Sequence, residues 1–421
     1  MSRTPVRERL STGLAALRER NFALYAVGQF ASQQGNWIEV TAVSWILYEM
    51  TNSPLLLGLS GLFRAAPMIL LLLFGGAIAD RVPKRLLLML TESTMLAVSL
   101  AMGLLALGES LEVWHLYLLN FISGTFSAFS LPARHALFGG LVPRSAIQSA
   151  VTLNALTVRS GFFIGPSIAG LTLAFGGNAV PFFLNAASFL AILVALWAMR
   201  LPPAQAATAA PRLSLGQGIT EGLRFVWRSP LLKIVLALDI ASGLFGHNTT
   251  LITILARDVL GTGPEGLGLL LSAIGAGALA GMSLMVTFGV ARYRQMILTA
   301  GALYVLLWAA FGLSLWLLLS VVLLFALGIV DGVWGVTRNT LAQLLVSDDL
   351  RGRVMSVVTL VTRGSSLIGR FQAGVLVELI GGPAAVIAGA GVIGAAILGS
   401  WRARVSDEGG ESAGSGSGTQ P

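Results

Sequence analysis

Seven charged side chains interrupt long apolar runs, and they are the residues of this chain best placed to do chemistry. They are the acids Glu39, Asp239 and Asp331 and the arginines Arg64, Arg159, Arg363 and Arg370. A charge is costly in hydrocarbon, so such a residue normally faces a cavity or a partner. An acid whose proton affinity depends on the side that it faces is what proton coupling requires. We expect Asp239 and Asp331 to carry protons, followed by Glu39.

The alternative for each acid is a structural ion pair that only fixes helix packing. Glu39 and Arg64 fall at a similar depth in consecutive apolar runs, so these two are one candidate pair. Other polar residues follow the first run at helical spacing and either bind a ligand or tie this helix to its neighbours. We favour a cavity, and the candidate substrate contacts are Gln33, Asn36, Trp37, Arg64, Arg363 and Trp334.

The composition places these residues in a membrane. The chain has 421 residues, of which 55% are hydrophobic and only 11% charged, whereas soluble proteins carry about 25% charged residues. Apolar runs of at least 18 residues recur, each long enough to cross ~30 Å of hydrocarbon. The alternation of a membrane β-barrel is missing. We therefore predict an all-α polytopic membrane protein.

Other classes of function are disfavoured by residue types. The net charge of +8 arises from bases between the apolar runs, which favours the membrane surface as a partner over nucleic acid. The chain has no Cys, and His115, His135 and His247 lack metal-ligand spacing, so we expect no metal or other cofactor. An enzyme would need a nucleophile near a base, and a sensor would need a folded soluble domain; the sequence indicates neither.

The apolar runs predict twelve membrane helices. Their expected ranges are 22–48, 55–79, 86–107, 113–133, 146–174, 178–199, 231–255, 264–289, 296–313, 315–338, 353–377 and 383–401. They form two six-helix halves, 21–200 and 231–401. Residues 1–20 form an N-terminal arm, 201–230 a linker with an interfacial helix, and 402–421 a disordered Gly/Ser-rich tail.

The basic residues orient this arrangement. Alternate loops carry Arg and Lys, including Arg81, Arg134, Arg144, Arg338 and Arg353, whereas the other loops carry mostly acids. Basic loops remain in the cytoplasm, so both termini are expected there. We predict a multi-pass protein of the bacterial inner membrane.

An internal repeat relates the two halves. A shift of 204 residues aligns 134–177 with 338–381, and 11 of 44 positions are then identical, including Arg159/Arg363, Gly165/Gly369 and Gly170/Gly374. Chance identity of about one in ten would give ~4 in this biased composition. The repeat predicts pseudo-symmetric halves with a substrate site between them, as in many secondary transporters.

Two motifs resemble the major facilitator superfamily. The first lies between the second and third runs, where the spacing Gly-x-x-x-Asp-Arg-x-x-(Lys/Arg)-Arg resembles that family's cytoplasmic gating loop. Its residues here are Gly76, Asp80, Arg81, Lys84 and Arg85. A simpler interpretation is a basic cytoplasmic turn with a fortuitous Asp.

The second motif lies in the fifth run and resembles the fifth-helix motif of exporters in that superfamily. Its residues are Arg159, Gly161, Gly165, Pro166 and Gly170. Glycines allow a neighbouring helix to approach closely, and proline removes a backbone hydrogen bond. The resemblance implies a sealed helix pair that favours antiport, and the alternative is generic helix packing.

Further segments extend the resemblance over about 18–400. They are Arg20-Asn21-Phe22, Ser32-x-x-Gly35-Asn36-Trp37, Thr157-Val158-Arg159, Gly222-Leu223-Arg224-Phe225 and Arg351-Gly352-Arg353. The chain is similar to the enterobactin-exporter and macrolide-efflux branch of the superfamily, a transmembrane secretion effector type. This implies a monomer with the major facilitator fold, driven by the proton-motive force, that exports a small organic compound such as a drug or siderophore.

The sequence also departs from that pattern and leaves alternatives open. Asn36 stands where many relatives carry Asp, Asn120 stands where drug antiporters often carry Arg, and the second half lacks the Asp-Arg gating loop. The alternative function is an uptake carrier or a lysolipid flippase of the same fold. Because the expected cavity holds charges of both signs, the sequence does not indicate the charge of the substrate.

Overall fold

The computed structural model describes residues 15–138, 140–200, 215–288, 293–346 and 348–402. Within these ranges the regular secondary structure is entirely helical. The expectations for the arm before residue 15, the linker before residue 215 and the tail after residue 402 lie outside the described residues.

The first half consists of six long helices. They are α2 (Arg20–Thr51), α3 (Pro54–Arg81), α4 (Lys84–Leu107), α5 (Val113–Phe138), α6 (Ile147–Gly176) and α7 (Val180–Ala198), with the short helices η1 (Ala15–Arg18) and η2 (Arg144–Ala146). Local chemistry sets their boundaries. Asn52 ends α2 in the left-handed conformation, and the Ser53 side chain accepts a hydrogen bond from the Leu56 amide where Pro54 begins α3.

The second half repeats this pattern after a short amphipathic helix. The elements are α8 (Leu215–Arg228), α9 (Pro230–Phe245), α10 (Thr249–Ile254), the π-helical η3 (Leu255–Val259), α11 (Pro264–Phe288), α12 (Tyr293–Gly312), α13 (Leu317–Leu345), α14 (Asp348–Ile380) and α15 (Gly382–Arg402). Val226 of α8 is buried against Val354 and Val358 of α14, so the described part of the linker packs on the second half.

The predicted all-α polytopic fold class is confirmed. Ten segments of the described chain are long and apolar enough to cross a membrane, with 232–259 counted as one. Two more helices, α2 and α14, have 32 and 33 residues but carry more polar side chains. Each of the twelve expected ranges therefore coincides with a described helical segment.

Two details of the predicted helices are wrong. The seventh is broken at residues 246–248 into α9 and α10, because the backbone leaves the helical region at Gly246 and Asn248. Helices α5 and α13 continue beyond their predicted ends to Phe138 and Leu345. Arg134 and Arg338 are consequently helical residues, although the sequence pattern placed them in basic loops.

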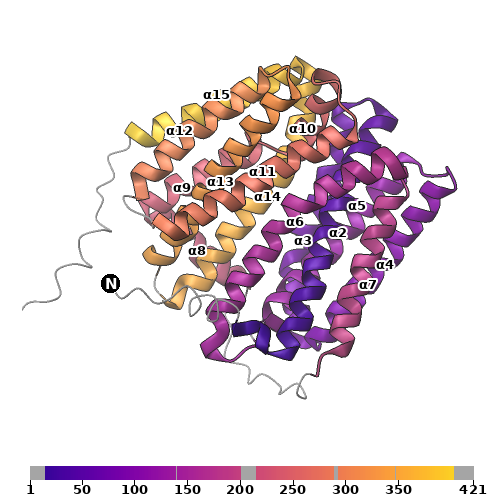
Figure 1. The fold of residues 1–421 in the computed structure, drawn as a ribbon. Coiled ribbons are helices and arrows are strands. Elements are labelled where there is room, and N and C mark those ends of the chain that lie inside the picture. The colour runs from indigo at the N-terminus through magenta and orange to yellow at the C-terminus, as the bar shows by residue number, and fades with distance from the viewer. Residues whose placement is uncertain (1–14, 139, 201–214, 289–292, 347, 403–421) are drawn as a thin grey trace, which may run out of the picture.

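The two groups of helices lie side by side in Figure 1, with α3 and α6 of the first group next to α14 and α11 of the second. Two helix pairs make the most extensive contacts between the groups: α3 with α14, which we call the first seam, and α6 with α11, which we call the second seam. The connections 52–53, 177–179 and 260–263 lie at one end of the bundle, which we call the outer end, following the predicted orientation.

Glycines allow the backbones to meet in both seams. In the first seam, a Cβ atom on Gly58 would lie 3.0 Å from Gly374 Cα and 2.9 Å from the Arg370 carbonyl oxygen. In the second seam, a Cβ atom on Gly170 would lie 3.0 Å from Glu265 Cα and 3.2 Å from Gly268 Cα. Real Cβ atoms rarely approach backbone this closely, so both seams need glycine. These contacts close the outer end of the bundle.

The seam glycines yield the first prediction. Gly170→Ala and Gly374→Ala each place a methyl group against the backbone of the opposite half, so we expect each to destabilise the described arrangement by about 1–3 kcal/mol. The measurement is thermal unfolding of the purified protein in nanodiscs. Gly391→Ala in α15 is the matched control, because nothing lies within 4 Å of its Cβ position. Equal effects at all three positions would contradict this account of the seams.

Candidate functional site

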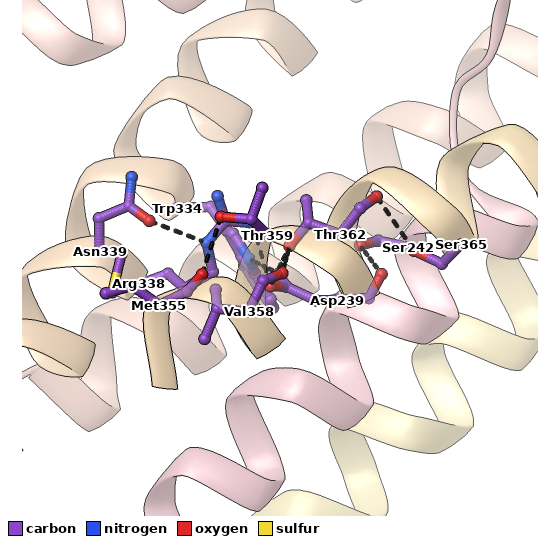
Figure 2. A network of polar contacts seen from close by, with 10 residues as sticks. All are labelled: Asp239, Ser242, Trp334, Arg338, Asn339, Met355, Val358, Thr359, Thr362 and Ser365. Atoms are coloured by element: carbon purple, nitrogen blue, oxygen red, sulfur yellow. Dashed lines mark hydrogen bonds and ion pairs between the residues drawn. The ribbon is translucent and has the colours of Figure 1, made fainter. Parts of the chain in front are cut away.

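Asp239 lies at the centre of a polar network inside the second half (Figure 2). Its carboxylate forms an ion pair of 3.0 Å with Arg338 Nη1 and accepts a hydrogen bond of 3.0 Å from Trp334 Nε1. The Thr362 hydroxyl adds a longer contact of 3.4 Å. The Asp239 side chain is only 2% exposed. Its partners lie on two other helices, so this buried acid connects α9 to α13 and α14.

This network shows the contacts of one predicted site residue, Trp334, and of one predicted loop residue, Arg338. Trp334 was a candidate substrate contact, but its indole N–H is used by Asp239. Arg338 was expected in a basic loop and instead supplies the counter-charge of Asp239. A buried acid without that partner would be strongly disfavoured, so the two residues depend on each other.

Asp331 forms a different kind of ion pair. Its carboxylate lies 3.9 Å from Arg159 Nη1, and the two side chains come from α13 and α6 in opposite halves. They are 34% and 33% exposed, although both lie in the middle of their helices. The structure thus brings together one predicted proton carrier and the arginine of the fifth-helix motif, across a space that is accessible between the halves.

Glu39, the third predicted acid, is buried inside the first half. The Ser99 hydroxyl and the Asn185 amide donate hydrogen bonds of 3.0 and 2.6 Å to the same carboxylate oxygen. The pairing with Arg64 that the sequence allowed is not formed among the described side chains. Arg64 lies one helix away and acts on Glu39 only through space.

A further buried ion pair was missed by the sequence reasoning. Glu92 of α4 pairs with Arg134 of α5, and Arg134 also donates to the side-chain oxygen of Gln29. Glu92 is a charged residue within the third apolar run, so the criterion that selected the other acids would have found it. Its partner had been assigned to a loop, which concealed the pair.

The polar stripe of α2 is mostly used for packing. The Trp37 ring lies over the notch formed by Gly161 and Gly165, and its centroid is 4.5 Å from that of Phe162. The Asn36 amide donates to the Ser32 carbonyl oxygen at 2.9 Å, within its own helix. The backbone of Gln33 contacts Gly161, and its side chain is half-buried.

The fifth-helix motif has two distinct contact surfaces. Gly161 and Gly165 pack against α2 of the same half, whereas Gly170 packs against α11 of the other half. The Pro166 carbonyl oxygen faces Gly268, so the proline lies within the second seam. The motif therefore connects a packing contact inside one half with a contact between the halves.

The structure describes only part of the predicted gating loop. Nothing is described of the Gly76, Asp80 and Arg81 side chains, so their contacts lie outside the described residues. Lys84 begins α4, and Arg85 Nη2 donates to the Trp197 carbonyl oxygen of α7 at 2.8 Å.

Two aromatic contacts were not expected from the sequence. At the outer end, the Tyr48 hydroxyl donates to the Asp258 carboxylate, and Arg257 donates to the Tyr48 carbonyl oxygen at 3.0 Å. This links α2 to η3 across the halves. Deeper in the second half, His247 Nδ1 lies 2.8 Å from the Tyr304 hydroxyl. The described residues contain no group of three or more His, Cys, Asp or Glu that fits a metal ion.

Comparison with known proteins identifies MFS-type transporters as relatives of this chain. A family model described as transmembrane secretion effector matches residues 11–415. The chain is 28% identical to the uncharacterized MFS-type transporter YfiS of Bacillus subtilis, over 84% of this chain and 86% of that protein. It is 26% identical to the multidrug efflux pump Tap of Mycolicibacterium fortuitum, over 82% and 87% of the two chains.

A second set of relatives matches about half of the chain, and solved structures match most of it. The enterobactin exporter EntS of Shigella boydii is 34% identical, over 43% of each chain. Among solved structures, the nucleoside transporter NupG has a TM-score of 0.71 at 12% identity, covering 90% of this chain and 98% of that one. A bacterial homologue of the lysosomal transporter Spinster has a TM-score of 0.65 at 16% identity, covering 90% and 94%. These two structures show the fold alone.

The Asp239–Arg338 pair yields the second prediction. Arg338→Gln leaves a buried carboxylate unpaired and Asp239→Asn leaves a guanidinium unpaired, so each should destabilise the protein by roughly 3 kcal/mol. The double variant should lose less than the sum of the two, with a coupling of about 1–3 kcal/mol. Unfolding of all four proteins in nanodiscs gives the cycle. Strict additivity would mean that the pair contributes nothing.

Proposed function

Because the chain belongs to the transmembrane secretion effector family of MFS transporters, we propose that it exports a small organic compound by proton antiport. Export is supported by the names of its relatives, a multidrug efflux pump and an enterobactin exporter. We further propose that it acts as a monomer in the bacterial inner membrane with both termini in the cytoplasm. The moving bodies are residues 21–200 and 231–401.

The observation that carries this proposal is the ion pair between Arg159 and Asp331. It joins the two halves at mid-height, and both side chains are about one-third exposed. Relative movement of the halves therefore changes the distance between this acid and its counter-charge. The Asp239–Arg338 pair lies within one half, so the same movement leaves it intact.

This pair supports a direction for the proposed proton movement. In the described arrangement the seams join the halves near the outer end, and the Asp331 carboxylate has Arg159 as its counter-charge. When the halves rock and α6 leaves α13, the carboxyl loses that partner and binds a proton more readily. A proton taken up from outside is then released inside when the pair re-forms. The gradient can drive export because the two conformers differ in proton affinity.

The third prediction tests this coupling. In sealed vesicles with an imposed pH gradient, a panel of hydrophobic drugs and siderophores is screened for substrate-induced proton movement with a pH-sensitive dye. We expect Asp331→Asn to abolish proton movement and to retain downhill substrate flux, because the neutral amide cannot exchange a proton. Asp239→Asn tests the second predicted carrier, and Glu378→Gln is the control, since that carboxylate is exposed at the end of α14.

The outcomes separate the possibilities. Uncoupled transport in the Asp331 variant and coupled transport in the control support antiport with Asp331 as the carrier. Coupling lost only in the Asp239 variant moves that role to Asp239. Wild-type transport that ignores the pH gradient would show that the carrier is a facilitator or uses another ion.

The fourth prediction tests the movement itself. The Ser167 and Ser272 hydroxyls lie 2.7 Å apart across the second seam, and the native chain has no Cys. We expect the Ser167→Cys/Ser272→Cys variant to form a disulfide on oxidation, to stop transporting, and to recover on reduction. In the control Ser314→Cys/Ser320→Cys, the bridge lies within one half, where the hydroxyls are 3.0 Å apart. Transport by the oxidised first variant would exclude rocking about this seam.

A further inference from the structure

The two seams share one backbone design. Pro54 and Gly58 of α3 face Gly374 in the first seam, and Pro264 and Gly268 of α11 face Gly170 in the second. The internal repeat already relates Gly170 to Gly374. Equivalent positions in the two seams can therefore be compared residue by residue.

The charges of the seams do not follow this symmetry. Pro54 is equivalent to Pro264 and Gly58 to Gly268, each pair 210 residues apart. The same offset makes Arg64 of α3 equivalent to Ile274 of α11. The neighbouring helices agree, because Gly124 of α5 packs on the Arg64 carbonyl oxygen as Gly328 of α13 packs on that of Ile274. Ile274 is fully buried, whereas its counterpart in the first seam carries a positive charge.

A second difference concerns the acid. Arg159 has Asp331 of α13 as its partner, and the repeat makes Arg363 of α14 the equivalent of Arg159. The equivalence of Gly124 and Gly328 makes Ser127 of α5 the counterpart of Asp331. Ser127 donates its hydroxyl to the Ser123 carbonyl oxygen at 2.6 Å. Arg363 is exposed and forms no ion pair with any described side chain. The first seam thus keeps the arginine and lacks the acid.

A third arginine adds to this excess. Arg370 is the residue of α14 that is equivalent to Pro166 in the second seam. A Cβ atom added to Gly61, one turn before Arg64, would lie 2.7 Å from the Arg370 Cβ atom. Among the described residues, the Arg370 guanidinium donates one hydrogen bond, to the Thr249 hydroxyl at 3.4 Å. Residues 361–374 run antiparallel to 54–69, since Gly374 faces Pro54 and Gly364 faces Ile69. Three arginines therefore follow one seam within a few helical turns.

The surrounding groups do not neutralise them. Glu39 acts on Arg64 through space, but its carboxylate is held by Ser99 and Asn185. Arg363 acts through space on Arg64 and His135, neither of which is an acid. Arg134, which also acts on His135, is already paired with Glu92. Unpaired cations at this depth are costly, and a bound anion would offset that cost.

We propose that Arg64 and Arg363 bind an anionic group, such as a carboxylate, sulfonate or phosphate, of the compound that this protein transports. The substrate class is then an organic anion with an apolar body. This inference rests on the proposed function and goes beyond it, because the sequence indicated no charge for the substrate. Arginine suits the role because its planar donors match the geometry of an oxyanion.

Ser127 offers the sharpest test, because an acid there would copy the second seam. Ser127→Asp is expected to weaken binding of carboxyfluorescein by roughly tenfold. Ser127→Asn is the control, because Asn has the size of Asp without its charge, and it should bind like wild type. Binding is measured by fluorescence anisotropy on the purified protein in nanodiscs. Rhodamine 123, a cation with the same ring system, should bind more weakly than carboxyfluorescein to the wild type.

Removal of the arginines provides the second arm. Arg64→Gln and Arg363→Gln should each weaken carboxyfluorescein binding by roughly tenfold. Arg224→Gln in α8 is the matched control, an exposed arginine outside the seam, and should have no effect. Competition by lysophosphatidate and by naphthalene sulfonate identifies whether the anion belongs to a lipid or to a soluble compound.

Several results would overturn the proposal. They are a wild type that binds no carboxyfluorescein or prefers rhodamine 123, equal binding by the Asp and Asn variants of Ser127, and unchanged binding when the arginines are replaced. These measurements are independent of transport. If the anion site holds and vesicles show no flux, the proposed export is wrong; if flux occurs and is insensitive to Ser127→Asp, the anion site is wrong.

Discussion

The arrangement of this protein depends on the close approach of backbones in its two seams. Gly58 meets Gly374 and Gly170 meets Gly268 with no side chain between them, so the helices cross at the smallest distance that packing allows. No large side chain lies between the two backbones at these points, so little side-chain packing is lost there when the helices separate. A pair of glycine crossings is therefore suited to a contact that must form and open repeatedly.

The ionic interactions divide according to whether they cross a seam. Glu92–Arg134 and Asp239–Arg338 lie inside single halves and are almost fully buried at the acid. Since breaking such a pair is expensive, each makes its half behave as a rigid body. Arg159–Asp331 crosses between the halves and is longer and more exposed. Rigid halves that share a weak ionic contact among their described residues are suited to a movement about the seams.

The helices were predictable and most of the pairings were not. Long apolar runs determine a membrane helix whatever its neighbours are, so the predicted ranges agree with the described helices to within a few residues at most ends. A partner is set by which helices pack together, and one sequence does not contain that information. Asp239 and Asp331 were recognised as unusual, but nothing in the chain indicated Arg338 or Arg159 as their partners.

Some errors have a specific physical reason. Arg134 and Arg338 resembled loop residues because basic charge usually marks the membrane surface, whereas a buried acid can hold an arginine deeper in the helix. Trp37 and Trp334 are a different case, because their role as substrate contacts stays a prediction. Trp37 fills a glycine notch, and Trp334 donates its N–H to an acid. Nothing in the sequence indicated either of these contacts inside one half.

The internal repeat explains how two related seams can hold different residues, one set suited to a proton and the other to an anion. A duplicated chain begins with two equivalent seams, and any site in one has a copy in the other. Here the copies have diverged: the second seam carries Arg159 with Asp331, and the first carries Arg64 and Arg363 with Ser127 in place of the acid. An arginine with an acid can exchange a proton, and arginines without one can hold an anion. In the proposed mechanism both seams open in the same rigid-body movement, which would couple the two events without any direct contact between the proton and the substrate.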